Sequence, residues 1–455
     1  MKGKSMTEGT IWKEVVLFAL PVLLGSLLQQ LYNTVDTIIV GRFASELSLS
    51  AVGTTGTLAY FFVTLAIGFG AGNGVLVAQH FGAKNEERVK IVAANGISLL
   101  LGLGLVASLV GIVGAPFAFK YMVNVPEEIL PQTISYFRIF CAGMIFQYGY
   151  NIFSSILRGV GDSASTLYFL LVSSVLNIFL DLLFVAVLKM DVNGAAIATV
   201  ISQAVSFVAA LVYMYKKYPV FRFRRHDFKF DAEAIRGTIK IGFPISFQQI
   251  VVSLGLTAIQ RAVNGFGQVM TASFTVGQRM EMYINIPCGA FQTTLATFAG
   301  QNYGAGKMDR VRKGTRQTVN ISVFFTLVIS ALIWIFTDQI IGLFGLSQQA
   351  AVFCRSHLQT IAFINIILSA YVPLFGLYQG LGHTTFLMLV SICALGTRIL
   401  VTYLFKDTGF FGYSIIWWNG LFGFGVGCAV TWGYYFTRRW ERIKQPGNRK
   451  DYRAI

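Results

Sequence analysis

Twelve stretches of this sequence are each apolar over a length that can cross a lipid bilayer, which limits the possible folds more than any other feature. A transmembrane helix needs about 20 mainly apolar residues, and the backbone inside a bilayer must bond internally. Charged residues make up only 12% of the chain, about half the share in a soluble domain. The sequence therefore predicts an all-α integral membrane protein, with spans near 14–40, 50–78, 91–116, 130–153, 165–188, 193–215, 237–262, 270–299, 316–337, 350–374, 385–405 and 411–436.

The basic residues indicate how these spans are oriented. Lys and Arg collect in the cytoplasmic loops of membrane proteins. Here they cluster near the first residues, in the turns after the second and eighth spans, in one long loop and in the tail. We therefore expect a multi-pass protein of a plasma membrane with both termini in the cytoplasm. The same distribution accounts for the net charge of +16, so we expect contact with membrane lipids and no binding of nucleic acid.

One stretch of the sequence occurs twice. AQHFGAKNEERVK at 78–90 returns as GQNYGAGKMDRVR at 300–312, 222 residues later. At nearly the same offset Pro21 matches Pro244, and RGVGD matches QGLGH. Six spans in each copy indicate parallel repeats related by an axis along the membrane normal. The predicted organisation is an N-terminal lobe at 1–215, a cytoplasmic inter-lobe loop at 216–236, a C-terminal lobe at 237–436 and a basic cytoplasmic tail at 437–455.

Three acidic residues lie within the spans, Asp36, Asp181 and Glu281. A charge there is costly and by default indicates function. At 1.5 Å per residue, Asp36 lies about 33 Å along a span entered from the cytoplasm, and Asp181 about 24 Å along another. Asn177 is four residues before Asp181 on the same helix face. Thr199 lies about six residues into the following span, so these residues of the N-terminal lobe fall in the outer half of the membrane.

Carboxylate, amide and hydroxyl oxygens are suitable ligands for a hard cation. Two neighbouring carboxylates in a low dielectric do not both stay ionised, so the pair can also hold a proton. The residues therefore predict a binding site for H⁺ or Na⁺ formed by Asp36, Asn177, Asp181 and Thr199. The alternative for each acid is a structural role, such as pairing with a basic residue elsewhere in the bundle.

Other polar residues in the spans are candidates for a substrate cavity. Gln29, Tyr32 and Asn33 share a helix face with the first acid. Glu281 lies about eleven residues into the eighth span. It is either an anion facing the cavity or the partner of Arg261 or Arg279 in a salt bridge. The predicted cavity set is Gln29, Tyr32, Asn33, Glu281 and Arg261.

The second half of the chain carries different charges at the corresponding positions. Arg261 lies near the counterpart of Asp36, and Arg398 is the counterpart of Asn177. This change from acid to base predicts that cation coupling belongs to the first lobe alone. The glycine-rich GFGAGNG at 68–74 lies inside a span, so it indicates close helix packing and not a nucleotide site.

Several segments together resemble the multidrug and toxic compound extrusion (MATE) family, in its DinF-like bacterial branch. They are LPVLLGSLLQQLYNTVDTIIVGRF, the two repeated turns, LRGVGDSAST and NIFLDLLFVAVLKMDVNGAAIATVISQ, and the resemblance covers about residues 11–436. It implies a V-shaped pair of six-helix lobes in a bacterial cytoplasmic membrane. It also implies export of organic cations or other amphiphiles by alternating access, in exchange for H⁺ or Na⁺. The family's cation site in the N-terminal lobe falls on Asp36, Asn177, Asp181 and Thr199.

Two other classes compete with this interpretation. A flippase for a lipid-linked precursor shares the architecture, and it would carry a larger, strongly basic cavity. An intramembrane enzyme would need a nucleophile and base or a metal motif, and the spans offer neither, so we predict no catalytic residues and no cofactor beyond the coupling ion. The five cysteines are scattered without metal-ligand or disulfide spacing.

Overall fold

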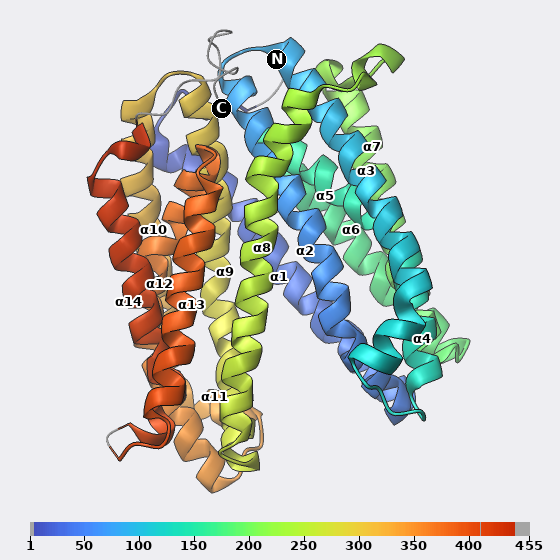
Figure 1. Cartoon of the computed structure of the whole chain (residues 1–455), viewed down its shortest axis with the longest axis vertical. Coiled ribbons are helices and arrows are strands. Elements are labelled where there is room, and N and C mark those ends of the chain that lie inside the picture. Colours follow the sequence, from blue (N-terminus) through green and yellow to red (C-terminus); the bar gives the residue numbers. More distant parts are fainter. Residues whose placement is uncertain (1–3, 410, 442–455) are drawn as a thin grey trace. The chain divides into compact units, whose positions relative to one another are not determined.

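The computed structural model describes residues 4–409 and 411–441, and the regular structure of these residues is helical throughout (Figure 1). The long helices follow the predicted apolar stretches and run side by side within each bundle. In chain order the α-helices are α1 Ile11–Phe43, α2 Glu46–Gly82, α3 Glu86–Phe117, α4 Leu130–Ala142, α5 Met144–Gly159, α6 Ser163–Asp181, α7 Asp191–Lys217, α8 Ala232–Asn264, α9 Gln268–Gly304, α10 Met308–Ile335, the short α11 Thr337–Leu343, α12 Gln348–Gly380, α13 Thr384–Phe405 and α14 Ile415–Phe436. Short π- or 3-10-helical segments are η1 Ala118–Met122, η2 Leu182–Val187, η3 Pro219–Phe221, η4 Arg225–Phe228, η5 Gly412–Ser414 and η6 Arg439–Glu441.

Ten helices in the described part of the chain are long and apolar enough to cross a membrane. The fourth predicted span, 130–153, is divided at Gly143 into α4 and α5. A Cβ atom at Gly143 would lie 2.5 Å from Cγ2 of Val200, so the residue between the two helices has no room for a side chain. The eighth predicted span lies within α9, whose sequence is interrupted by polar residues. The tail predicted at 437–455 lies outside the described residues from 442 onward.

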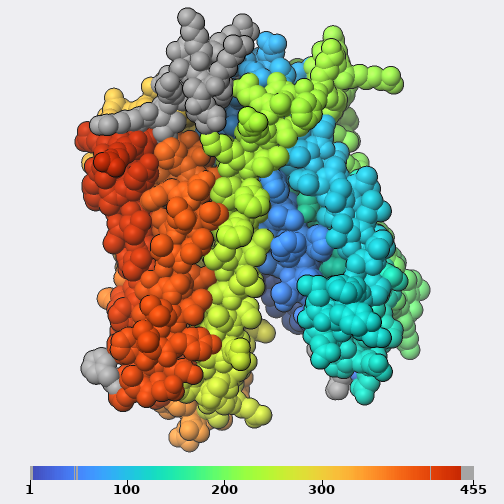
Figure 2. Space-filling view, viewed as in Figure 1, coloured from blue at the N-terminus to red at the C-terminus, as the bar shows by residue number. Residues whose placement is uncertain are grey.

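The outward faces of the helices are apolar. Val113 on α3 is 76% exposed, Phe179 on α6 is 62% exposed and Leu400 on α13 is 60% exposed. Figure 2 shows the surface that α13 and α14 form, in orange and red. Exposed apolar side chains distributed over helix after helix are suited to contact with lipid chains and not with water.

The described chain forms two compact units, and two of the helices belong to both. Unit 1 holds residues up to Ser5 together with Leu24–Ser246, and unit 2 holds Met6–Leu23 together with the chain from Phe247. Helix α1 therefore begins in unit 2 and ends in unit 1, whereas α8 begins in unit 1 and ends in unit 2. Each change of unit occurs shortly after a proline, Pro21 or Pro244, inside a helix that continues through it.

The repeat reappears in the packing of each unit. In unit 1, α2 packs along α5, and in unit 2, α9 packs along α12. A Cβ atom at Gly159 would lie 2.7 Å from the carbonyl oxygen of Gly74, and one at Gly380 would lie 2.5 Å from that of Ala296. These two contacts occupy equivalent positions of the repeat. The glycine-rich segment 68–74 therefore serves close helix packing, as predicted.

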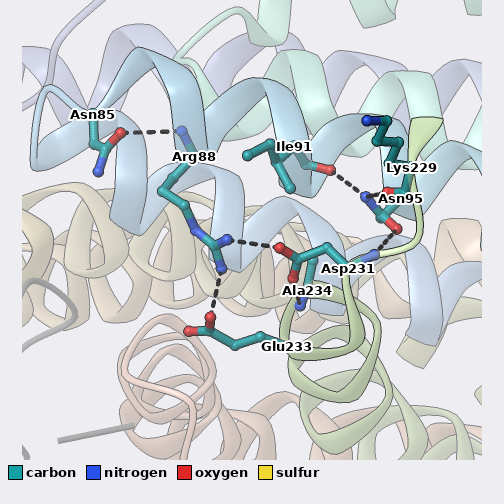
Figure 3. A network of polar contacts seen from close by, with 8 residues as sticks. All are labelled: Asn85, Arg88, Ile91, Asn95, Lys229, Asp231, Glu233 and Ala234. Carbon is teal, nitrogen blue, oxygen red and sulfur yellow. Dashed lines mark hydrogen bonds and ion pairs between the residues drawn. The ribbon is translucent and has the colours of Figure 1, made fainter. Parts of the chain in front are cut away.

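The first copy of the repeated turn holds the segment that leads into α8 (Figure 3). Nη1 of Arg88 lies 2.9 Å from Oδ2 of Asp231, and its Nη2 lies 3.0 Å from Oε2 of Glu233. The other carboxylate oxygen of Asp231 accepts a hydrogen bond of 2.8 Å from the backbone N–H of Ala234 in the first turn of α8. Arg88 thus fixes the acidic residue that caps this helix.

The second copy of the turn positions the segment that leads into α1. Arg310 is the counterpart of Arg88, 222 residues later. Its guanidinium donates to the carbonyl oxygens of Met6 at 3.2 Å, Glu8 at 2.5 Å and Gly9 at 2.8 Å. Each unit therefore contains one arginine of the repeated turn, and this arginine binds at the start of a helix that is shared by the two units. The helix is α8 for Arg88 and α1 for Arg310.

Asp162, from the repeated RGVGD motif, is the centre of a second cluster in unit 1. Oδ2 of Asp162 accepts hydrogen bonds from Tyr213 at 2.9 Å, Lys217 at 3.1 Å and Tyr218 at 2.6 Å, while Oδ1 caps α6 through the N–H of Ser165. Burial alone raises the pKa of this carboxyl, but the hydrogen bonds outweigh burial and hold its pKa below the ordinary value.

We predict that Arg88→Ala lowers the free energy of unfolding by about 1 kcal/mol, because it removes two partly buried ion pairs that position the start of α8. Thermal unfolding of the purified protein in detergent measures the change. Arg225→Ala removes the same charge from an exposed position of the neighbouring loop and is the control. Equal losses in the two variants would show that the ion pairs do not stabilise the fold.

We predict that Asp162→Asn lowers the free energy of unfolding at pH 7 by roughly 1 to 3 kcal/mol. Asparagine keeps the helix cap and loses the charge. The lowered pKa of Asp162 in the folded state stabilises the fold above the unfolded-state pKa of about 3.9, and this stabilisation disappears as the pH falls through the folded-state value. The free energies of unfolding of variant and wild type should therefore differ more at pH 7 than at pH 3. A constant difference at both values would contradict the electrostatic explanation.

Candidate functional site

The structure brings together the four residues predicted to bind the coupling ion. Asp36 lies on α1, Asn177 and Asp181 lie on α6, and Thr199 lies on α7, all in unit 1. Asp181 and Asn177 are fully buried, and Asp36 and Thr199 are half-buried. The side chains of Asp36 and Asp181 lie within hydrogen-bonding reach of each other. Two carboxyl groups can share a hydrogen bond only when one of them holds a proton.

The local structure of α6 sets the direction of its two ligands. Asp181 is the last residue of α6 before the π-helical segment η2, and Asn177 is one turn earlier on the same face. With the amide nitrogen of Asn177 facing the carboxylate, it donates to Oδ2 of Asp181 at 2.6 Å, and its oxygen accepts from the backbone N–H of Thr199 at 3.3 Å. The amide therefore links the acid on α6 to the first turns of α7.

The site lacks a basic partner among the described residues. Oδ1 of Asp36 and Oδ1 of Asp181 are both buried without a hydrogen-bond partner in the part of the chain that the structure describes. No Lys, Arg or His in that part forms an ion pair with either acid. A buried carboxylate without a partner is strongly destabilising. The donor set therefore fits a bound cation or proton, and not the structural ion pair considered as the alternative.

Of the three cavity candidates on α1, one reaches this site. The hydroxyl of Tyr32 lies within hydrogen-bonding reach of the side chain of Thr199. Gln29 and Asn33 lie on the exposed side of α1. Tyr136 of α4 lies within electrostatic reach of both acids, although it was not among the predicted site residues. The sequence predicts the span that contains Tyr136. The periodicity of a helix does not reveal, however, which neighbouring helix a given residue faces.

Unit 2 contains a cavity of about 460 Å³ bordered by residues of α8, α9, α12, α13 and α14. Glu281 of α9 and Arg398 of α13 both line it. Arg261 is exposed and lies outside the lining. Of the two interpretations of Glu281, the cavity position is the observed one, since no ion pair joins it to Arg261 or Arg279 within the described residues.

Arg398 is held in a fixed direction. Its Nε donates to Oδ1 of Asn419 on α14 at 2.8 Å, and its guanidinium lies 4.9 Å from the ring centroid of Phe424. Thr402, the repeat counterpart of Asp181, donates its hydroxyl to the carbonyl oxygen of Arg398 at 2.7 Å. Where unit 1 places an amide beside a carboxyl pair, unit 2 therefore places an anchored cation.

A second, smaller pocket of about 10 Å³ adjoins the same two charged residues, and it is about large enough for one water molecule. His357 lines this pocket, stacked between the rings of Phe274 at 5.1 Å and Trp417 at 5.3 Å. Nδ1 of His357 and both polar atoms of the Asn365 side chain are buried without a partner in the described chain. His357 lies on α12, and its two stacking rings come from α9 and α14.

The profile of the MatE family matches the chain twice, over residues 21–183 and 244–404. The chain belongs to the MatE family. The two matches begin at Pro21 and Pro244, so they coincide with the repeat found in the sequence. The acid pair and Asn177 fall in the first MatE match, and both charged residues of the unit 2 cavity fall in the second.

Individual relatives support the same assignment. The chain is 28% identical over 438 residues to the probable multidrug resistance protein YoeA of Bacillus subtilis (strain 168), covering 94% of both chains. It is 28% identical over 454 residues to YpnP, a probable multidrug resistance protein of the same bacterium, covering 98% of this chain and 99% of YpnP. It also resembles an outward-facing structure of a multidrug resistance MATE family transporter of the MOP superfamily. The TM-score is 0.92 at 25% identity, over 97% of this chain and 99% of the other. The fold of this chain is thus the all-helical MATE fold of a transporter family, and the chain is not an enzyme.

Proposed function

We propose that this protein is a cation-coupled antiporter of a bacterial plasma membrane that exports amphiphilic, drug-like compounds in exchange for H⁺ or Na⁺. The observation that carries the proposal is the pair of contacting carboxyl groups, Asp36 and Asp181, which has no basic partner in the described chain. Similarity to YoeA and YpnP supports the drug-like substrate class. We assign the chain to the DinF-like branch, and its Lys and Arg distribution supports cytoplasmic termini.

The charge of the acid pair couples entry of the ion to export of the substrate. With both carboxylates ionised, their repulsion in a low dielectric favours separation of α1 from α6. A proton or Na⁺ removes that repulsion, while the amide of Asn177 donates to Asp181 and so holds this carboxylate in place. An ion that binds one arrangement more tightly shifts the population toward it. Entry of the ion therefore favours one conformation and its release favours the other.

The unit 2 cavity favours drug-sized substrates over the lipid-linked precursor of the flippase alternative. A volume of about 460 Å³ falls in the usual range of pockets for small molecules, about 300–1,000 Å³. Its lining holds one acid and one base, whereas a flippase for a large anionic precursor would need a strongly basic surface.

We predict that Asp36→Asn and Asp181→Asn each reduce gradient-driven export to the rate of protein-free vesicles, because neither variant retains an acid pair that can gain and lose an ion. The measurement is efflux of a fluorescent amphiphile from reconstituted vesicles under a proton gradient and, separately, under a sodium gradient. Asp407→Asn, at an 82% exposed side chain, is the control and should transport normally. Full gradient-driven export by both site variants would refute the proposed coupling.

A further inference from the structure

The cavity in unit 2 exposes one carboxylate and one guanidinium that do not pair with each other. Glu281 and Arg398 both line it, yet no ion pair or hydrogen bond joins them. We propose that this cavity is a binding site for zwitterionic amphiphiles, with the ligand ammonium at Glu281 and the ligand carboxylate at Arg398. The inference rests on the proposed export function, because it names the chemical class that this cavity accepts.

Arg398 is prepared to receive a carboxylate. Asn419 occupies its Nε, and the ring of Phe424 lies against the guanidinium plane. The two terminal nitrogens have no hydrogen-bond partner among the residues that the structure describes, so they remain available at the cavity. Two parallel N–H donors match the two oxygens of a carboxylate. Glu281 interacts electrostatically with Arg398 but forms no ion pair with it, so a bound carboxylate would give the guanidinium a direct hydrogen-bonded partner.

Glu281 supplies the opposite charge. It is the one acidic residue in the lining of the described cavity, and its carboxylate accepts no hydrogen bond from any described residue. The smaller water-sized pocket lies on the same two residues, so both charged groups border the cavity and a space that can hold water. A ligand ammonium can therefore reach Glu281 without displacing a protein partner.

The remainder of the lining suits the body of an amphiphile. Tyr371, Phe375 and Phe424 contribute aromatic surface, and Gln278 and Asn285 contribute amides. Oδ1 of Asn285 is buried without a partner in the described chain and can accept a further N–H or O–H. Aromatic walls with a few polar groups are typical of small-molecule pockets.

The two fixed charges select against ligands that carry a single charge. A cation gains the attraction of Glu281 and suffers repulsion from Arg398, while an anion experiences the reverse. Only a ligand with both charges pairs with both groups. One charge-assisted hydrogen bond corresponds to about a tenfold change in affinity or more, so a zwitterion should bind about 10-fold more tightly than either singly charged analogue.

Three probes that share the same fluorescent dansyl group test this predicted order of affinities. They are Nε-dansyl-lysine, which is zwitterionic, its methyl ester, which is a cation, and its Nα-acetyl derivative, which is an anion. Binding is measured by dansyl fluorescence with the purified full-length protein in lipid nanodiscs. The expected result is about 10-fold tighter binding of the zwitterion to the wild type. Equal affinities for the three probes, or no measurable binding of the zwitterion, would overturn the proposal.

The variants assign each charge to its half of the ligand. Arg398→Gln should weaken zwitterion binding about 10-fold and leave the methyl ester unchanged or tighter. Glu281→Gln should weaken zwitterion binding by a similar factor, and it should leave the affinity for the acetyl derivative unchanged or higher. Arg398→Lys should retain the preference, which guards against a folding defect in the glutamine variant. Parallel weakening of all three probes in both glutamine variants would overturn the assignment.

Two further variants keep this test separate from the proposed coupling. Arg261→Gln removes a basic residue outside the lining and should leave all three affinities unchanged. Asp36→Asn should abolish export and still bind the zwitterion more tightly than either singly charged probe. Export that persists in Asp36→Asn contradicts the coupling proposal, whereas loss of zwitterion selectivity in Arg261→Gln contradicts the binding site.

Discussion

A bilayer interior offers no water to the peptide backbone, and the helical structure of this protein depends on that constraint. Each apolar segment forms a helix because only internal hydrogen bonds are available to it. Association of such helices then relies on close packing, because lipid chains are as apolar as the side chains they replace. The contacts of Gly159 with Gly74 and of Gly380 with Ala296 meet this need at equivalent positions of the two units.

The same scaffold carries opposite chemistry in its two units. In unit 1 the position before the end of α6 holds Asn177 beside an acid pair, whereas its counterpart in unit 2 is Arg398, fixed by Asn419. Because burying a charge is expensive in both places, each unit must stabilise its charge differently. Unit 1 leaves carboxyl oxygens without a partner among the described residues, which suits an exchangeable ion. Unit 2 places one acid and one base in the lining of the same cavity without an ion pair between them, which suits a ligand that brings both charges.

The repeated basic turn has a structural role at the two helices, α1 and α8, that are divided between the units. Arg88 binds Asp231 just before α8 and Glu233 in the first turn of α8, and Arg310 binds the backbone before α1. Each arginine thus fixes the start of a helix whose far end belongs to the other unit.

The sequence by itself determined the helical class, the repeat and the polar residues of the proposed ion site. Apolar length, charge and periodicity are local properties, and depth along a helix can be counted residue by residue, which placed Asp36, Asn177, Asp181 and Thr199 at similar depth. Only the tertiary structure decided which neighbours these helices present to one another. It placed Tyr136 beside the acids, divided a predicted span at Gly143, and gave Glu281 a cavity shared with Arg398 in place of a salt bridge to Arg261 or Arg279. The physical reason is that helix periodicity defines the face of a residue, whereas the partner of that face depends on how several distant helices pack together.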